Sequence, residues 1–247
     1  MSSQTSAPLP SEGPPVRAAG VVREALSIYR RRFARVAVSA VPVFALIGAM
    51  GIVLHVLEGE HLEDVGTAEV GGVLLLVVVA ALIRSVGSVV YAGFLEQAVG
   101  ADIDDQPLPS ITDALRTLPI WRLIGADVVV TLIVAAATVL AVVPGLIAFA
   151  LLGIVGPVIN IEDRGVFDAI RRSVELTRGR FWTAFALLVP LLVVEHAAET
   201  WFVLAVDGTP VLAAIGFGVL IGLTVGATLG LIEVVLAHRL IRADRER

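Results

Sequence analysis

Long apolar runs, separated by short polar segments, make up most of this sequence. A helix needs about 20 predominantly apolar residues to cross the hydrocarbon core of a bilayer. The pattern predicts an all-α integral membrane protein, a six-transmembrane helix bundle with short cytoplasmic amphipathic helices. The predicted spans are Val36–Leu57, Val70–Phe94, Ile124–Val143, Leu146–Ile161, Phe181–Val206 and Val211–Leu236.

Two interruptions shape the middle of the chain. Only Pro144 and Gly145 separate the third and fourth apolar runs, and this turn-forming dipeptide predicts a tight helical hairpin. The fourth run is short and contains Gly153, Gly156 and Pro157. It is therefore predicted either to cross the bilayer fully or to form a kinked or re-entrant element, which would change the number of crossings.

The composition favours one membrane domain. Of the 247 residues, 57% are hydrophobic and 17% are charged, and the mean hydropathy is +0.92, values outside the usual range of soluble domains. Residues 1–15 are rich in Ser, Pro and Gly and predict a disordered cytoplasmic tail, because they cannot bury enough apolar area to offset the entropy of ordering. Residues 16–242 form the predicted domain, and residues 243–247 form a cytoplasmic C-terminal tail.

The distribution of arginine predicts the orientation. All 18 basic residues are arginines, and 17 of them fall before the first run, in the two loops on the same side, or after the last run. The opposite loop, Glu58–Glu69, carries five acidic residues and no basic one. Positive residues concentrate on the cytoplasmic side of membrane proteins. We therefore expect a multi-pass protein with both termini in the cytoplasm.

A weak repeat precedes three of the spans. Arg23–Leu26, Thr112–Leu115 and Phe167–Ile170 each place an acidic residue before Ala-Leu or Ala-Ile, and arginines and an aromatic residue follow. Each predicts a short amphipathic helix on the inner membrane surface that leads into a two-span hairpin. The alternative is that any helix entering a bilayer from the cytoplasm has this pattern, without a true repeat.

Several classes of function have no support in the sequence. There are no cysteines, which excludes thiolate catalysis, disulfides and Cys-ligated metals. The net charge of −5 and the lack of a separate basic domain argue against nucleic acid as a partner. No phosphate-binding loop, nucleophile elbow or zinc-protease motif occurs. We therefore expect no enzymatic activity, no cofactor and no bound metal.

Arg84 is the only arginine far from the cytoplasmic side, near the middle of the second span. A charge at that depth is costly unless it is paired or hydrated. Glu195 lies at a matching depth on the fifth span, so we predict an ion pair of Arg84 with Glu195 or with Glu199, one turn away. Together with His196, these residues form a candidate proton or ion pathway. The alternatives are a structural pair that sets the register of the two spans, or a solvated cluster near the outer surface.

Other polar residues fall toward the cytoplasmic ends of the predicted spans: Glu96, Asp127, Glu233 and His238. We expect them to reach the interface or nearby arginines, and an arginine on a surface helix is the predicted partner of Glu233 or Asp127.

In the last span, glycines recur about every four residues from Gly216 to Gly230. This spacing predicts close packing within the bundle or against a second copy.

One segment resembles a known family. Gly156–Trp182 combines Pro157, Glu162 and Gly165 with the segments Ala-Ile-Arg-Arg-Ser and Leu-Thr-Arg-Gly-Arg-Phe-Trp. This pattern resembles the membrane domain attached to some glycerophosphoryl diester phosphodiesterases, which also occurs as stand-alone bacterial membrane proteins. Ala25–Phe33 is similar to the first helix of that family. The resemblance implies a bacterial inner-membrane location, but no phosphodiesterase activity, because that chemistry belongs to a separate soluble barrel domain.

The sequence thus favours a non-enzymatic bacterial inner-membrane protein, a scaffold that binds lipid or a partner. The expected partners are membrane lipids, and another membrane protein or a second copy of the chain. The candidate contacts to anionic lipid head groups are Arg171, Arg172, Arg178 and Arg180. The alternative function is a small-molecule or proton-coupled transporter that uses the cluster of Arg84, Glu195, His196 and Glu199.

Overall fold

The computed structural model describes residues 16–61, 67–103, 106, 110–206 and 211–246, and the predicted N-terminal tail lies outside them. Every regular element in these ranges is a helix, as predicted. Six helical segments are long and apolar enough to cross a membrane, which confirms the predicted number of candidate spans. They are Ala18–Ile52, Leu75–Ile103, Ile120–Leu140, Val142–Glu162, Phe181–Ala198 and Ala213–Arg245.

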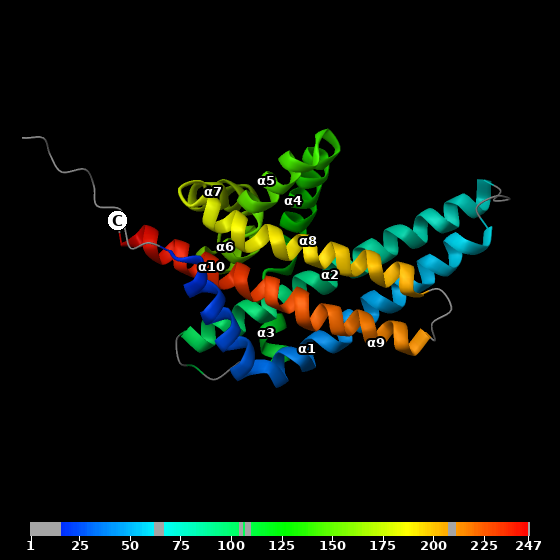
Figure 1. Ribbon diagram of the computed structural model, residues 1–247, viewed down its shortest axis with the longest axis horizontal. Helices are drawn as coiled ribbons and strands as arrows, with labels where there is room; N and C mark the ends of the chain where they lie inside the picture. The colour runs from blue at the N-terminus through cyan, green and yellow to red at the C-terminus, as the bar shows by residue number, and fades with distance from the viewer. Residues whose placement is uncertain (1–15, 62–66, 104–105, 107–109, 207–210, 247) are drawn as a thin grey trace, which may run out of the picture.

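The first two long helices, α1 (Ala18–His61) and α2 (Thr67–Ile103), run side by side away from the rest of the bundle (Figure 1). The predicted N-terminal surface helix is the start of α1 rather than a separate element. Figure 1 shows this start at a steep angle to the remainder of α1. Arg31 and Arg32 both pair with Asp102 of α2, at 2.5 and 3.2 Å, and these contacts tie the two helices together.

The second predicted surface helix is α3 (Ile111–Thr117), a separate element that precedes α4 (Ile120–Leu140). Its N-cap is Ser110, whose hydroxyl oxygen accepts a hydrogen bond from the Asp113 backbone N–H at 3.2 Å. The same hydroxyl donates to the Asp113 carboxylate at 2.6 Å. This cap satisfies a backbone donor that the first turn leaves unpaired, so the helix begins at the polar residue before the apolar run.

The turn between α4 and α5 (Val142–Leu152) lies at Ala141, not at the predicted Pro144 and Gly145. Pro144 is the third residue of α5. Backbone N–H groups in the first turn of a helix have no acceptor within the helix, so the missing N–H of proline costs nothing there. Gly145 faces Thr138 of α4, and a Cβ at that position would overlap the Thr138 side chain. The dipeptide therefore starts α5 and lets the two arms of the hairpin approach closely, while the turn itself needs only one extended residue.

The fourth candidate span is broken at Gly153 and Ile154 into α5 and α6 (Val155–Glu162), in agreement with the kinked alternative. Asp163 ends α6 in the left-handed region, with φ of 49°. Its carboxylate accepts a hydrogen bond from Arg122 at the start of α4, at 2.7 Å. The third predicted surface helix, α7 (Val166–Arg178), follows after two residues.

The last helices carry the centre of the bundle. The chain continues through α8 (Phe181–Val206), α9 (Val211–Ile221), a π-helical turn η1 (Gly222–Gly226) and α10 (Ala227–Arg245), which runs past the predicted domain boundary at residue 242. Figure 1 shows α10 passing between α1 and α8. The largest fully buried side chains of α10 are Leu231, Leu236 and Leu240.

Phe44 of α1 packs against the π-helical turn. Its ring lies over Gly222, where a Cβ would overlap ring atoms, and its tip is 3.3 Å from the Cβ position of Gly226. Tyr29 donates a hydrogen bond to the Leu223 carbonyl at 2.8 Å, and this bond satisfies a backbone group in the irregular turn. The predicted close packing at the glycines of the last span is thus confirmed within the chain for this part of the stripe.

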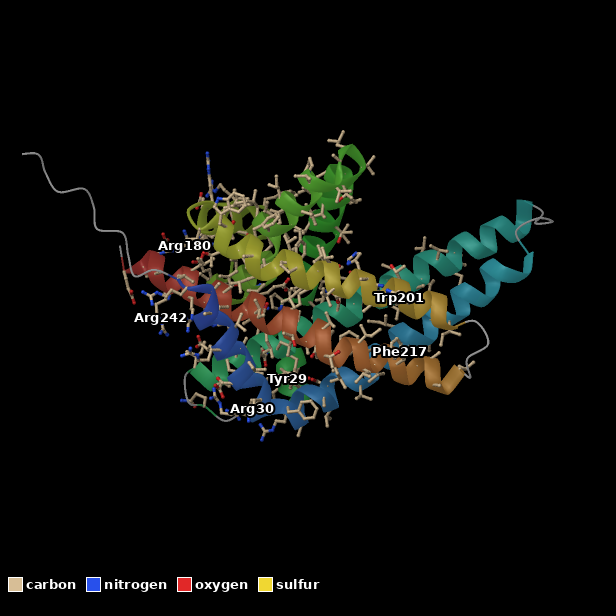
Figure 2. All side chains as sticks on the ribbon, viewed as in Figure 1. Tyr29, Arg30, Arg180, Trp201, Phe217 and Arg242 are labelled. Atoms are coloured by element: carbon tan, nitrogen blue, oxygen red, sulfur yellow. The ribbon has the colours of Figure 1, made fainter. Side chains whose placement is uncertain are left out.

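Arginine side chains gather at one end of the bundle. Figure 2 shows Arg30, Arg180 and Arg242 at this end, and Trp201 and Phe217 toward the other. The three arginines come from α1, from the junction of α7 and α8, and from α10. We call this side of the molecule the arginine end.

We predict that Gly222→Ala destabilises the protein by about 1–3 kcal/mol, because the new methyl group displaces the Phe44 ring. The matched control is Gly216→Ala on α9, where nothing lies within 4 Å of the Cβ position. That control should leave the stability unchanged or raise it slightly. Thermal unfolding in detergent measures both, and equal melting temperatures for the two variants would contradict the packing described.

Candidate functional site

The break between α5 and α6 brings two carboxylates from other helices against one stretch of backbone. The Cβ position of Gly156 is 3.8 Å from Oε1 of Glu96 on α2. The Cβ position of Gly153 is 3.8 Å from Oε1 of Glu233 on α10. Glycine leaves space for a carboxylate at both points. The interrupted helix therefore serves as a shared wall for Glu96 and Glu233.

Glu96 is the most deeply placed of these acids, with only 6% of its surface exposed. The side-chain amide of Asn160, on α6, donates a hydrogen bond to Glu96 Oε2. The other amide atom, Asn160 Oδ1, is buried and has no hydrogen-bond partner among the described residues. Buried acceptors normally have a partner. Asn160 Oδ1 is therefore an unsatisfied acceptor packed beside Glu96.

A central cavity of about 250 Å³ adjoins these groups, bounded by α2, α4, α10 and the break between α5 and α6. Besides Glu96 and Glu233, it is lined by Asp127 of α4, whose carboxylate accepts a hydrogen bond from Ser85 at 2.6 Å. Most of the remaining lining is apolar or glycine. At about 30 Å³ per water molecule, the cavity has room for several waters.

Two more cavities extend from this region toward the arginine end. A side cavity of about 510 Å³ shares Glu96 with the central cavity and is also lined by Asn160 and His238. An end cavity of about 330 Å³ shares His238 with the side cavity and is also lined by the exposed residues Arg242 and Glu246. The shared residues make a polar series from the arginine end to the interior.

Glu195 of α8 continues this series on the other side of Glu233. Its Oε1 lies 3.5 Å from the Cβ position of Gly226, at the end of the π-helical turn. Glu233 interacts electrostatically with both Glu195 and Glu96. We call Glu96, Glu233 and Glu195 the carboxylate series. Neighbouring carboxyl groups titrate as a coupled set rather than one by one.

The sequence-predicted intramembrane cluster is only partly assembled here. Arg84 lies exposed on α2 and Glu195 is half-buried, and both take part in a polar contact. Their mutual ion pair stays a prediction. His196 is exposed and its Nδ1 lies 3.2 Å from the Leu192 carbonyl of its own helix, so it points away from the bundle interior. The side chain of Glu199 lies outside the described part of the chain.

Glu96 and Glu233 were expected to reach the interface or nearby arginines, and the structure packs both against the break between α5 and α6. Glu96 lies just past the end of the second predicted span, and α2 continues as a helix to Ile103. Glu233 lies within the last predicted span, between the apolar residues Ile232 and Val234. For Glu96, hydropathy alone ended the predicted span too early.

The inner face of α7 is fixed to the end of α5. Ser173 and Thr177 are fully buried, and the Ser173 hydroxyl donates to the Leu151 carbonyl at 2.7 Å. The Thr177 hydroxyl shares its proton between the Ser173 carbonyl at 2.7 Å and the Leu151 carbonyl at 3.2 Å. The break after Leu152 leaves that carbonyl without a helical partner. Residues of the segment that resembles the known family therefore complete the hydrogen bonds of the broken helix.

Arg172 clamps three helices. It donates to Glu162 of α6 at 3.1 Å and to Asp244 of α10 at 2.7 Å, with 16% of its side chain exposed. Its hydrogen bonds to Glu162 raise the pKa of the guanidinium, burial opposes that rise, and the bond to Asp244 adds to it. Arg164 also pairs with Glu162, at 2.5 Å. The clamp keeps its charge at every ordinary pH.

The other three predicted lipid contacts have different surroundings. Arg171 is 71% exposed and lies within 4 Å of Asp168 and Glu175 on its own helix. Arg178 is exposed, and Arg180 is half-buried and makes a polar contact. Arg172 is therefore a structural residue, whereas Arg171 and Arg178 face outward.

Within the described residues, no three His, Asp or Glu side chains come together in a way that could hold a metal ion. Comparisons with protein-family models, with curated proteins and with solved structures found no match for the chain. The resemblance to the phosphodiesterase-associated membrane domain therefore stays a prediction. What the structure itself shows is an all-helical chain with six candidate membrane spans and an interior carboxylate series.

We predict that Arg172→Ala lowers the stability by about 1.5–3 kcal/mol, because it removes charged hydrogen bonds to Glu162 and Asp244. The matched control is Arg171→Ala, the neighbouring exposed arginine, which should cost no more than about 0.5 kcal/mol. Thermal unfolding in detergent compares the two. A loss of stability of the same size for both variants would contradict a stabilising role of the clamp.

Proposed function

We propose that this chain conducts protons across the bacterial inner membrane, without enzymatic activity, and that Glu96 and Glu233 carry the proton. One observation carries the proposal: both carboxylates line one cavity between the helices, and two further cavities toward the arginine end share Glu96 and His238 as lining residues. Ionisable residues inside membrane segments are rare, and they typically mark ion pathways and proton relays.

The proposed route follows the shared residues of the three cavities. A proton from the arginine end meets His238 first, since this side chain borders both the end cavity and the side cavity. Histidine exchanges protons near neutral pH. The proton then passes through water to the Glu96 carboxylate, and from the Glu96 carboxyl group through water in the central cavity to the Glu233 carboxylate. Each transfer breaks one O–H or N–H bond and forms another.

Glu195 supplies the next acceptor on this route. It lies on α8 and interacts with Glu233, so a proton on Glu233 has a neighbouring carboxylate on the side away from Glu96. Of the cluster predicted from the sequence, Glu195 is thus the member with a place in the route. A role for Arg84 is to stabilise the charge of Glu195 when the proton has left, if the predicted ion pair forms.

The proposal prefers transport to the scaffold role that the sequence favoured. A scaffold needs no buried carboxylates, and burying such groups is costly unless they are well satisfied. The Asn160 amide donates to one oxygen of Glu96, and its own carbonyl oxygen is buried without a partner in the described structure. The predicted lipid contact concerns a different surface, the outer face of α7.

We predict that purified protein in liposomes supports proton flux, measured with an internal pH-sensitive dye under an imposed potential. Glu96→Gln and Glu233→Gln should each reduce the flux by about 100-fold, the usual contribution of a positioned proton-transfer group. Glutamine keeps the shape of the side chain and its hydrogen-bonding capacity, but it cannot release a proton in this pH range.

The matched control for these variants is Glu175→Gln, an exposed acid on α7 that lines none of the three cavities. It should leave the flux unchanged. Thermal unfolding shows whether each variant is folded. The proposal is wrong if wild-type liposomes conduct no faster than empty ones, or if folded Glu96→Gln and Glu233→Gln proteins conduct as wild type does.

We also predict the orientation, with the arginine end in the cytoplasm. The chain has no cysteine, so single-cysteine variants report cleanly on each side. Glu60→Cys, in the last turn of α1 at the end opposite the arginines, should react with a membrane-impermeant maleimide in intact cells. Arg178→Cys should react only after the membrane is permeabilised. The reverse result would place both termini outside.

A further inference from the structure

The helix α7 has two chemically different faces. Its inner face is buried and is held by the Ser173 and Thr177 bonds to Leu151 and by the Arg172 clamp. Its outer face exposes two arginines that the interior does not use, Arg171 and Arg178. Because the inner contacts fix the helix in place, the outer side chains are held at a constant height on the surface.

Large aromatic side chains surround this outer face. Phe167 opens α7 and is 78% exposed, and Trp182 opens α8 and is 77% exposed. Trp121, in the first turn of α4, is 86% exposed, and that turn lies beside α7, since the Cβ position of Gly125 is 3.7 Å from Val166. Exposed tryptophans at the starts of membrane helices are typical of the level of the lipid head groups.

Between Arg164 and Arg180 the chain carries five arginines and two acids. Arg164 and Arg172 are paired with acids of the bundle. The two acids of the segment, Asp168 and Glu175, are exposed and lie within 4 Å of Arg171. Arg178 and Arg180 therefore leave an excess of positive charge at the C-terminal end of the helix. Arg180 lies at the arginine end with Arg30 and Arg242, as Figure 2 shows. The combination of outward arginines with an aromatic rim is complementary to a negatively charged membrane surface.

We infer that the outer face of α7 binds the head groups of anionic phospholipids. Arg171 and Arg178 contact the phosphates, while Phe167, Trp182 and Trp121 lie in the boundary between head groups and acyl chains. The aromatic rim favours lipid over free phosphate, because a soluble anion gains nothing from apolar side chains at its edge. This binding is independent of proton transport, and it does not involve the residues of the carboxylate series.

The test uses full-length purified protein and measures retention of phosphatidylglycerol against phosphatidylcholine in detergent, by native mass spectrometry. Wild type should retain phosphatidylglycerol preferentially. The double variant Arg171→Gln/Arg178→Gln should lose about 5-fold in relative retention for each arginine removed. The matched control is Arg116→Gln, an exposed arginine on α3, which should keep the wild-type preference.

Four results would overturn the inference. The first is equal retention of the two lipids by wild type, and the second is an unchanged preference in the folded double variant. The third is a change of oligomeric state in the double variant with its lipid preference intact, which would identify the face as a contact between copies of the chain. Inorganic phosphate at millimolar concentration should not displace the lipid, and displacement would mean that the site binds the free anion.

Discussion

The hydrogen bonds from Ser173 and Thr177 to the Leu151 carbonyl support most of what is distinctive in this molecule. A helix that breaks inside a bilayer leaves backbone carbonyls without partners, and lipid cannot supply them. Here two hydroxyls from α7 satisfy the last turn of α5, so the chain can bend at Gly153. That bend places Gly153 and Gly156 beside Glu233 and Glu96. The carboxylate series therefore depends on a bond made by a helix at the surface.

The Arg172 clamp acts on the same region from the other side. Glu162 follows Asn160 by two residues on α6, and Asp244 lies on the helix that carries Glu233. Arg172 therefore joins α6, which carries Asn160, to α10, which carries Glu233. The guanidinium pairs with two carboxylates, so one charged hydrogen bond remains when water breaks the other. The positions of α6 and α10 in the bundle thus depend on the charge of Arg172.

Sequence patterns predicted the candidate spans well and the turns and interior acids poorly. A span is a sum over about 20 residues, so errors at single positions average out. A turn is decided by one residue, and Ala141 carries no turn signal, whereas Pro144 carries a strong one that a first helical turn tolerates. Glu96 was assigned to the interface because hydropathy falls after Phe94, yet α2 continues as a helix to Ile103. Glu233 lay inside the last predicted span, but hydropathy does not reveal which helices pack against it.

The two adjacent arginines of the Ala-Ile-Arg-Arg-Ser segment show why a motif alone does not assign roles. Successive residues on a helix point about 100° apart, so Arg172 faces the bundle when Arg171 faces outward. A pattern of residue types contains both side chains but not the rotation that separates them. Two buried residues set that rotation: Ala169, about one turn before Arg172, and Ser173, directly after it. The same segment can therefore hold the interior together with one arginine and meet the membrane surface with the other.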